Sequence, residues 1–258
     1  MIPKKIHYCW YGNGKYNEVI NKCINSWKEK LPGYQIKKWD ETNTPFDKLP
    51  FLKPLYKQKK WSFITDYMRL YTIYTEGGIY LDTDIEMLKS FDSLLHEKAF
   101  LGFQVKDIEA KYPLNSAVIG AEKGSKFILD CLKETERKQR LSFNSMGGPP
   151  IVSKILRDYG LDQYRTQHLK DVNILETDYF YPFSWLEEFS PDCITKNTIC
   201  IHWWEDSWTT KEKGAPYYIN SFTRKIQKLP QLLADMMVYY FNQKKFYKVT
   251  PLNPLIKD

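Results

Sequence analysis

The sequence lacks the cysteine patterns that mark disulfide-rich and zinc-binding proteins. Its five cysteines are an odd number at irregular spacings, and no C-x-x-C pair occurs. Such a set is typical of reduced, mostly buried thiols. We therefore expect neither a disulfide framework nor a cysteine-based zinc site.

Long apolar runs are also missing. The first seven residues lack the apolar core of a signal peptide, and no stretch approaches the roughly 18–20 apolar residues of a membrane-spanning helix. We therefore expect a cytoplasmic protein. The chain has no internal repeat and no low-complexity linker, so its 258 residues are expected to form one domain with at most an appended subdomain.

Aromatic side chains are abundant. They make up 16% of a chain that is 43% hydrophobic, which excludes intrinsic disorder. Nineteen tyrosines and eight tryptophans exceed what one core needs. Such side chains offer a flat apolar face and a polar edge, and they often line sugar or base sites. The alternative is a tyrosine-rich interior.

The net charge of +7 is concentrated at the C-terminal end. Residues 211–258 contain nine Lys or Arg and three Asp or Glu, which gives 9 − 3 = +6, so the rest of the chain is nearly neutral. We predict a catalytic domain at 1–210 and a helical, basic extension at 211–258. Basic and apolar residues alternate in this extension, which favours peripheral association with an anionic membrane over nucleic-acid binding. The alternative is a solvated helical subdomain.

Short apolar runs alternate with helical patterns along the chain. This order predicts an α/β domain with a largely parallel sheet, whose ligands gather outside the carboxyl ends of the strands. The predicted strands are 5–10, 34–39, 79–81, 99–104, 117–120, 172–175 and 198–203, and the predicted helices are 18–30, 61–74, 125–137 and one after 149–150. Within 61–74, one helical face is predicted to carry Phe63, Tyr67, Leu70 and Tyr74.

Two acids follow the apolar run at 79–81. Asp82 and Asp84 are separated by one residue, and side chains at i and i+2 of an extended segment point to the same face. Paired carboxylates suit Mg²⁺ or Mn²⁺ held jointly with substrate phosphates. Because a metal-bound diphosphate is a good leaving group, this pattern indicates a glycosyltransferase that uses a nucleotide sugar.

Two further groups of residues are candidates for the same site. His202 follows an apolar run and is a candidate third metal ligand, although a lone histidine is more often structural. Ser207 and Trp208 follow it as candidate phosphate and sugar contacts. Asp66 and Arg69 lie three residues apart on a predicted helix. They form either an exposed ion pair worth roughly 0.3–0.5 kcal/mol or a pair that binds sugar hydroxyls and phosphate oxygens.

The blocks at 6–12, 26–40 and 66–84 together resemble the family 32 glycosyltransferases, which include bacterial capsule and lipopolysaccharide sugar transferases. The chain is more distantly similar to the catalytic core of the clostridial glucosylating toxins. The resemblance implies a GT-A fold, Rossmann-like with a mostly parallel central sheet flanked by helices. It also implies a nucleotide-sugar donor, Mn²⁺ or Mg²⁺, and retention of the anomeric configuration.

The resemblance also implies a role for each matching position. Trp10 would stack on the donor base, Asp66 and Arg69 would hold the donor sugar, and Ser207 and Trp208 would lie near the β-phosphate. Asp82 would act through the metal shell and Asp84 would bind the metal directly, with His202 as another ligand where the toxins use an amide residue. Asn115 and residues 147–149 would border the acceptor cleft.

These expectations describe a retaining, metal-dependent transferase. It would transfer a hexose to a saccharide or lipid-linked acceptor in surface polysaccharide synthesis. A UDP-sugar is the preferred donor, and GDP-mannose is an open alternative. No protein nucleophile is evident, which fits attack from the face that the diphosphate leaves. The alternatives are a haloacid-dehalogenase-like phosphatase, whose motif also places D-x-D after a strand, and a non-catalytic carbohydrate-binding module.

Overall fold

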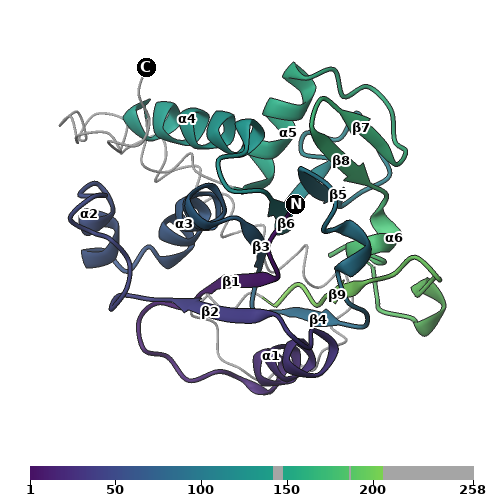
Figure 1. Ribbon diagram of the computed structural model, residues 1–258, viewed down its shortest axis with the longest axis horizontal. Helices are drawn as coiled ribbons and strands as arrows, with labels where there is room; N and C mark the ends of the chain where they lie inside the picture. The colour runs from purple at the N-terminus through teal and green to yellow at the C-terminus, as the bar shows by residue number, and fades with distance from the viewer. Residues whose placement is uncertain (142–147, 186, 206–258) are drawn as a thin grey trace.

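A seven-stranded sheet forms the centre of the computed structural model, which describes residues 1–141, 148–185 and 187–205 (Figure 1). The strand order is β2-β1-β3-β6-β5-β8-β7, and β4 and β9 form a separate two-stranded sheet. The strands are β1 (Lys5–Cys9), β2 (Gln35–Trp39), β3 (Gly78–Leu81), β4 (Ile85–Met87), β5 (Ala99–Phe103), β6 (Leu114–Ala121), β7 (Gln167–Leu169), β8 (Val172–Leu175) and β9 (Cys200–His202). The expected α/β architecture is confirmed.

The large sheet is parallel in most of its strands but has a reversed strand near its middle. The pairs β1–β2, β1–β3 and β5–β8 are parallel, whereas β3–β6, β5–β6 and β7–β8 are antiparallel. Five strands therefore run in one direction, and β6 and β7 run against them. A loop without a crossover helix joins β5 to β6, which fits antiparallel pairing because parallel neighbours need a longer crossover.

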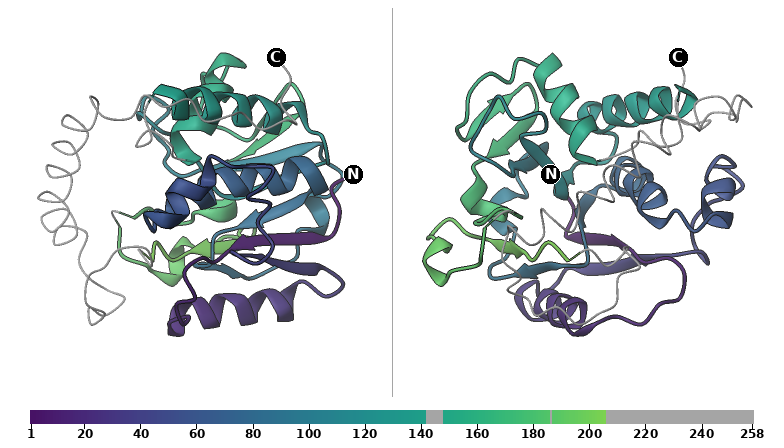
Figure 2. Two further views of the ribbon diagram at one scale, coloured as in Figure 1. Left: turned by 90° about the vertical axis from the view of Figure 1, so that its left-hand side faces the viewer. Right: turned by 180° about the vertical axis from the view of Figure 1, so that it is seen from behind.

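Helices cover both faces of the sheet. Figures 1 and 2 show α1 on one side of β1 and β2, and α3 and α4 on the other side. Alternate side chains of β3 supply the two cores: Tyr80 packs in the core with α3, whereas Ile79 and Leu81 pack in the core with α1. The helices are α1 (Glu18–Lys30), α2 (Leu52–Lys57), α3 (Trp61–Glu76), α4 (Lys126–Leu141), α5 (Gly148–Asp158) and α6 (Thr177–Phe180), with 3₁₀ turns η1 (Asp92–Leu94) and η2 (Pro191–Cys193).

Several predicted elements differ from the structure in their ends. Strand β6 begins at Leu114 rather than at residue 117, and β9 is confined to Cys200–His202. Helix α5 begins at Gly148, so the prolines at 149 and 150 lie in its first turn, where a missing N–H breaks no helical hydrogen bond. The short α2, α6, β4 and β7 were not predicted, because segments of three to six residues carry little periodicity. The predicted extension at 211–258 lies outside the described residues.

Helix α3 leads directly into the strand that carries the acid pair. Gly77 ends the helix with φ 69°, and Gly78 follows with φ 114°. A Cβ on Gly78 would lie 2.7 Å from the carbonyl oxygen of Lys5, so this turn requires glycine. The tight turn therefore lets α3 lie beside β3.

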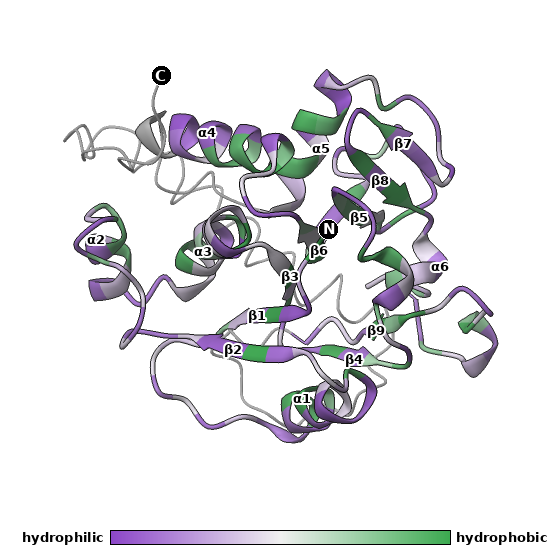
Figure 3. Ribbon diagram, viewed as in Figure 1, coloured by the Kyte–Doolittle hydropathy of each residue, from purple (hydrophilic) through white to green (hydrophobic). Residues whose placement is uncertain are grey.

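The buried face of α3 is broader than predicted, and its pattern is typical of a helix between two layers. Helix α4, which packs against α3, carries both hydrophilic and hydrophobic residues along its length (Figure 3). On α3, Tyr67 and Leu70 are buried as expected, but Phe63 and Tyr74 are only partly buried. The additional buried apolar side chains of the helix are Ile64, Met68, Tyr71 and Ile73.

A buried histidine ties the first strand to this turn. His7 is fully buried, its Nε2 lies 2.9 Å from the carbonyl oxygen of Gly77, and its Nδ1 accepts a 3.0 Å hydrogen bond from Trp39 Nε1. The proton of the neutral ring is therefore on Nε2. Burial lowers the pKa of His7 to about 4, against the smaller opposing effects of the Gly77 carbonyl and Glu76.

The first prediction concerns the pH dependence of stability at His7. The unfolded chain binds the proton below about pH 6.5 and the folded chain only near pH 4, so protonation favours the unfolded state between these values. Relative to His7→Gln, the natural chain should lose about 2 kcal/mol of unfolding free energy between pH 7 and pH 5. Urea unfolding at both pH values measures this difference. A pH-independent difference between the two proteins would contradict the assigned burial of the neutral ring.

Candidate functional site

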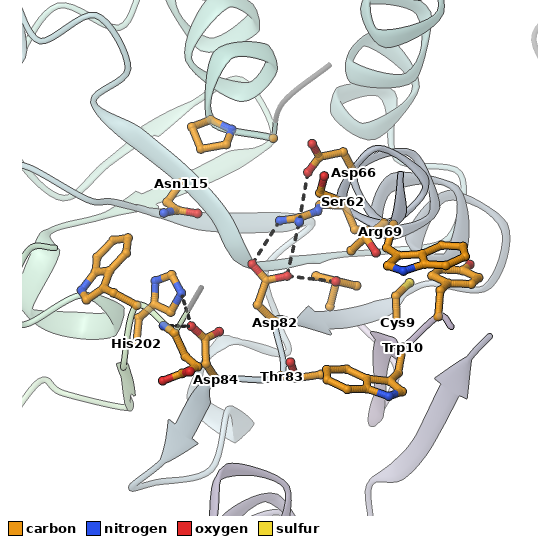
Figure 4. Close-up of a pocket in the computed structure, with 18 of the residues that line it drawn as sticks. Cys9, Trp10, Ser62, Asp66, Arg69, Asp82, Thr83, Asp84, Asn115 and His202 are labelled. Carbon is orange, nitrogen blue, oxygen red and sulfur yellow. Dashed lines mark hydrogen bonds and ion pairs between the residues drawn. The ribbon is translucent and has the colours of Figure 1, made fainter. Parts of the chain in front are cut away.

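A cleft of about 500 Å³ opens at the carboxyl end of β1 and β3 (Figure 4). Its lining comes from the segments that follow β1 and β3, from the first half of α3, from the start of β6 and α5, and from the segments around Trp185 and β9. This is the edge where ligands of α/β sheets were expected. The predicted residues that line it are Trp10, Asp66, Arg69, Asp82, Asp84, Asn115, Gly148, Pro149 and His202.

Asp82, Asp84 and His202 meet in this cleft. One ligand atom from each lies within 4.8 Å of the other two. The acids converge for a different reason than predicted: β3 ends at Leu81, and both aspartates lie on the tight connection to β4 rather than on an extended strand. Strand β4 then pairs with β9 so that Ile85 lies opposite His202, which brings the imidazole to Asp84.

Asp84 is the more buried of the two acids and is held in its charged form. Its Oδ2 lies 3.1 Å from His202 Nε2 and accepts a 2.8 Å hydrogen bond from the backbone N–H of Glu205. Burial by itself would raise the pKa of Asp84, but His202 and this backbone N–H lower it overall. The carboxylate is therefore available as a ligand at neutral pH.

The three side chains are a candidate ligand set for a divalent cation. Neighbouring ligands of an octahedral ion lie about 3–4 Å apart, and the 3.1 Å separation between Asp84 and His202 matches this spacing. Two carboxylates and one imidazole form a donor set that suits Mn²⁺ and, less closely, Mg²⁺. His202 Nδ1 is buried without a hydrogen-bond partner, so the polar groups of this imidazole are not all used within the described residues.

Arg69 links the acid on α3 to the acid after β3. Its guanidinium lies 3.0 Å from Asp66 and 3.3 Å from Asp82, and it donates 3.0 Å hydrogen bonds to the carbonyl and hydroxyl oxygens of Ser116. The predicted Asp66–Arg69 contact is confirmed. It is buried rather than exposed, since the Arg69 side chain is only 8% exposed. The second contact, with Asp82, was not predicted.

Tyr80 is a site residue that sequence reasoning missed. Its hydroxyl donates a 2.9 Å hydrogen bond to Asp82 Oδ1, and its ring lies 4.9 Å from the Arg69 guanidinium carbon. The sequence contained a signal for this contact, because Tyr80 lies near the end of a predicted strand and precedes Asp82 by two residues. Trp61 and Ser62, at the start of α3, also line the cleft and were not predicted.

Gly148, the first residue of α5, contacts the Asp66 carboxylate. The backbone N–H of Gly148 hydrogen-bonds to Asp66. Burial raises the pKa of Asp66 to about 6, and Arg69 and this backbone hydrogen bond oppose the increase. A Cβ on Gly148 would lie 1.9 Å from Ser116 Oγ and 3.4 Å from an Arg69 nitrogen, so only glycine fits at this position.

Trp10 and His202 lie on opposite sides of the acid pair, as Figure 4 shows. Trp10 is half-buried, and its Nε1 donates a 2.7 Å hydrogen bond to the carbonyl oxygen of Gly14. An edge contact with Tyr16 at 4.8 Å between ring centres also holds the indole. The predicted contacts Ser207 and Trp208, and residue 147, lie outside the described residues.

Within the described part of the chain, no helix is both long and apolar enough to span a membrane.

Residues 17–101 match the model of a family described as "Glycosyltransferase sugar-binding region containing DXD motif". The match covers about a third of the chain, and residues 17–101 are called the sugar-binding region below after the name of that family. The match includes Asp66, Arg69 and the D-x-D formed by Asp82 and Asp84. It confirms the resemblance to glycosyltransferases that the blocks at 26–40 and 66–84 indicated. His202, outside the sugar-binding region, joins it through the β4–β9 pairing.

Several known proteins are similar to parts of the chain. Lactosylceramide 4-alpha-galactosyltransferase of Mus musculus is 27% identical over 152 residues, covering 55% of this chain and 40% of that protein. Inositol phosphoceramide mannosyltransferase 3 of Schizosaccharomyces pombe is 29% identical over 145 residues, covering 53% and 38%. The matched part thus spans about two fifths of these relatives. The solved structure titled PaToxG Glycosyltransferase matches with a TM-score of 0.49 at 19% identity, covering 61% of this chain and 69% of that one.

The second prediction tests the packing around the sugar-binding region. In Gly148→Ala the new methyl group meets Ser116 Oγ, so stability should fall by about 1–3 kcal/mol, as for other overpacked sites. Removing the hydroxyl in the double variant Gly148→Ala/Ser116→Ala should recover part of that loss relative to Ser116→Ala alone. Urea unfolding of the four proteins measures the coupling. Additive effects would show that the two residues are not in the described contact.

Proposed function

We propose that the chain is a metal-dependent glycosyltransferase that moves a hexose from a nucleotide sugar to a saccharide or lipid-linked acceptor. One observation carries the proposal: Asp82, Asp84 and His202 form a candidate donor set for a divalent cation inside a cleft that the sugar-binding region helps to line. A bound cation would supply positive charge beside the departing diphosphate. Mn²⁺ is the preferred ion, because an imidazole is among the ligands.

The protein groups around this donor set keep it in place. Arg69 offsets the negative charge of Asp66 and Asp82 in a partly buried cleft. Tyr80 fixes one oxygen of Asp82. All the terminal nitrogens of Arg69 have protein contacts, so we assign it to orienting the two carboxylates and Asp66 to accepting a hydroxyl of the donor sugar.

Retention of the anomeric configuration fits the state of the carboxylates that line the cleft. Each of the four has a partner: Asp66 contacts Arg69, Asp82 contacts Tyr80 and Arg69, Asp84 contacts His202, and Glu205 accepts from Asn17. We assign Asp82 and Asp84 to the cation and Asp66 to the donor sugar, and we assign no carboxylate of the described lining to nucleophilic attack. We therefore propose front-face attack by the acceptor hydroxyl, with the leaving phosphate oxygen taking its proton.

We propose the donor and the acceptor as chemical classes rather than as single compounds. The printed names of the two relatives specify a galactosyl and a mannosyl transfer, so they support hexose transfer without choosing the sugar. Both names also specify a ceramide lipid as acceptor, which supports a lipid-linked acceptor here. UDP remains our preferred nucleotide, and bacterial capsule or lipopolysaccharide synthesis at the inner membrane face remains the setting that the resemblance implies.

The match to the sugar-binding region favours transfer over the two alternatives. The D-x-D lies within that region, together with Asp66 and Arg69, rather than standing alone as in a haloacid-dehalogenase-like phosphatase. A carbohydrate-binding module would not need a cation site facing the same cleft. Hydrolysis of p-nitrophenyl phosphate would identify the phosphatase, and the absence of any donor cleavage would identify the binding module.

The third prediction tests the proposed function directly. Incubation with a panel of UDP- and GDP-hexoses and Mn²⁺ should release nucleotide from at least one donor, and EDTA should abolish the release. Asp84→Asn should lower the rate at least about a hundredfold, because it removes the charge of a metal ligand. The exposed Asp162→Asn is the matched control and should keep the natural rate. Release that survives EDTA or the Asp84→Asn change would refute the role of the cation.

The fourth prediction concerns Trp10. If its half-buried indole stacks on the donor base, Trp10→Ala should weaken binding of UDP in the presence of Mg²⁺ by about 1–3 kcal/mol, and Trp10→Phe should restore most of the affinity. Calorimetric titration gives both values. Equal affinities in the natural chain and in Trp10→Ala would place the base elsewhere.

A further inference from the structure

Trp185 is unusual among the large apolar side chains of the described residues. It is 37% exposed, and only Met1 and Tyr112 share such exposure. Unlike those two, Trp185 lines the cleft. An indole that is partly exposed on the wall of a cleft offers a flat apolar surface to a ligand.

Phe183, two residues before Trp185, and Phe189, four residues after it, both belong to an aromatic cluster. The rings of Phe183, Phe189 and Trp203 pack with one another at 4.9–6.0 Å between centres. Trp204 Nε1 also donates a 3.1 Å hydrogen bond to the carbonyl oxygen of Phe183. Trp185 therefore projects from a supported platform, so little ordering is needed when a ligand binds.

This platform adjoins the histidine end of the cation site. The ring of Trp204 lies 4.0 Å from the ring of His202. The same ring contacts Tyr181 at 5.9 Å, and Tyr181 lies in the segment that leads from α6 to Trp185. Trp185 is thus tied to the His202 side, whereas Trp10 lies beyond the acid pair on the other side (Figure 4).

The order of the strands also separates Trp185 from Trp10. Trp10 follows β1, Asp82 follows β3, Asn115 lies at the start of β6, and Trp185 comes after β8 and α6. Along the sheet these strands follow the order β1, β3, β6, β5 and β8. A donor whose base lies at Trp10 and whose diphosphate lies at Asp82 and Asp84 leaves the far end of the cleft for the other substrate.

On the basis of the function proposed above, we propose that Trp185 forms the acceptor subsite and stacks against the terminal sugar ring of a saccharide acceptor. The hydrogens on one face of a pyranose ring make that face apolar, and it matches the indole plane. The acceptor that this site selects is therefore a glycoside with at least one sugar residue. A lipid or protein hydroxyl without a sugar would gain nothing from the indole.

A kinetic test separates the two substrates. With the donor found in the panel above and lactose or lactosylceramide as acceptor probes, Trp185→Ala should raise the KM for the probe about tenfold. The KM for the donor and the rate of donor hydrolysis without acceptor should change less than about twofold. Trp185→Phe should recover most of the loss, because it restores a flat ring. Equal KM values for the probe in Trp185→Ala and the natural chain would overturn the assignment.

Tyr112→Ala is the matched control, because Tyr112 has the same 37% exposure but does not line the cleft. It should leave every constant unchanged. An increase in the donor KM in Trp185→Ala, without a change for the probe, would move Trp185 to the donor site and refute the proposal.

A binding measurement keeps the proposal testable even without turnover. The full chain labelled with 5-fluorotryptophan should show a ¹⁹F resonance that is missing in Trp185→Phe, and this assigns Trp185. In the presence of UDP and Mg²⁺, a panel of mono- and disaccharides that includes lactose should shift this resonance saturably, whereas glycerol should not. No saturable shift with any sugar would refute the acceptor subsite. Absence of metal-dependent donor cleavage in the natural chain would refute only the proposed function.

Discussion

The site depends on one buried ionic contact, the guanidinium of Arg69 between Asp66 and Asp82. Burial disfavours the charged form of Asp66 and the nearby charge of Asp82 adds to this effect, whereas the charge of Arg69 opposes both. Because Arg69 comes from α3 and Asp82 from the end of β3, the same contact also fixes the helix against the strand. The Gly77–Gly78 turn makes this contact possible by reversing the chain within two residues.

The reversed strand β6 completes the site in a way that a fully parallel sheet would not. Because β6 runs against β3 and β5, its first residues, rather than its last, lie at the edge where the cleft opens. Ser116 can therefore accept hydrogen bonds from Arg69, and Asn115 can line the cleft. The start of α5 then packs against Ser116 through Gly148, at a distance that leaves no room for a side chain.

The sequence allowed the main elements and most of the cleft to be predicted, because they have strong local signals. The acids at 82 and 84 end an apolar run, and Asp66 and Arg69 have helical spacing. The contact between Arg69 and Asp82 could not be predicted, because it depends on how α3 lies on β3. His202 was a candidate from its place after an apolar run and from the resemblance. Its approach to Asp84 depends on the pairing of two three-residue strands, which have too few residues for a periodic pattern. Trp185 gave no sequence signal, since its exposure depends on an aromatic cluster formed by distant residues.

The aromatic residues lie both in the core and along the cleft. Seven of the fourteen tyrosines among the described residues are buried, so the tyrosine-rich interior expected as the alternative accounts for about half of them. Two rings that line the cleft are more exposed: Trp10 is half-buried and is held by Gly14 and Tyr16, and Trp185 lies between Phe183 and Phe189, which pack on Trp203. Between them lies the only group of three or more potential metal ligands that the described residues bring together. A charged centre between two flat apolar walls favours a ligand with the same order of parts: a ring, a diphosphate and a second ring. A nucleotide sugar beside a saccharide has this order, whereas a phosphate monoester or a single sugar would use only part of the cleft.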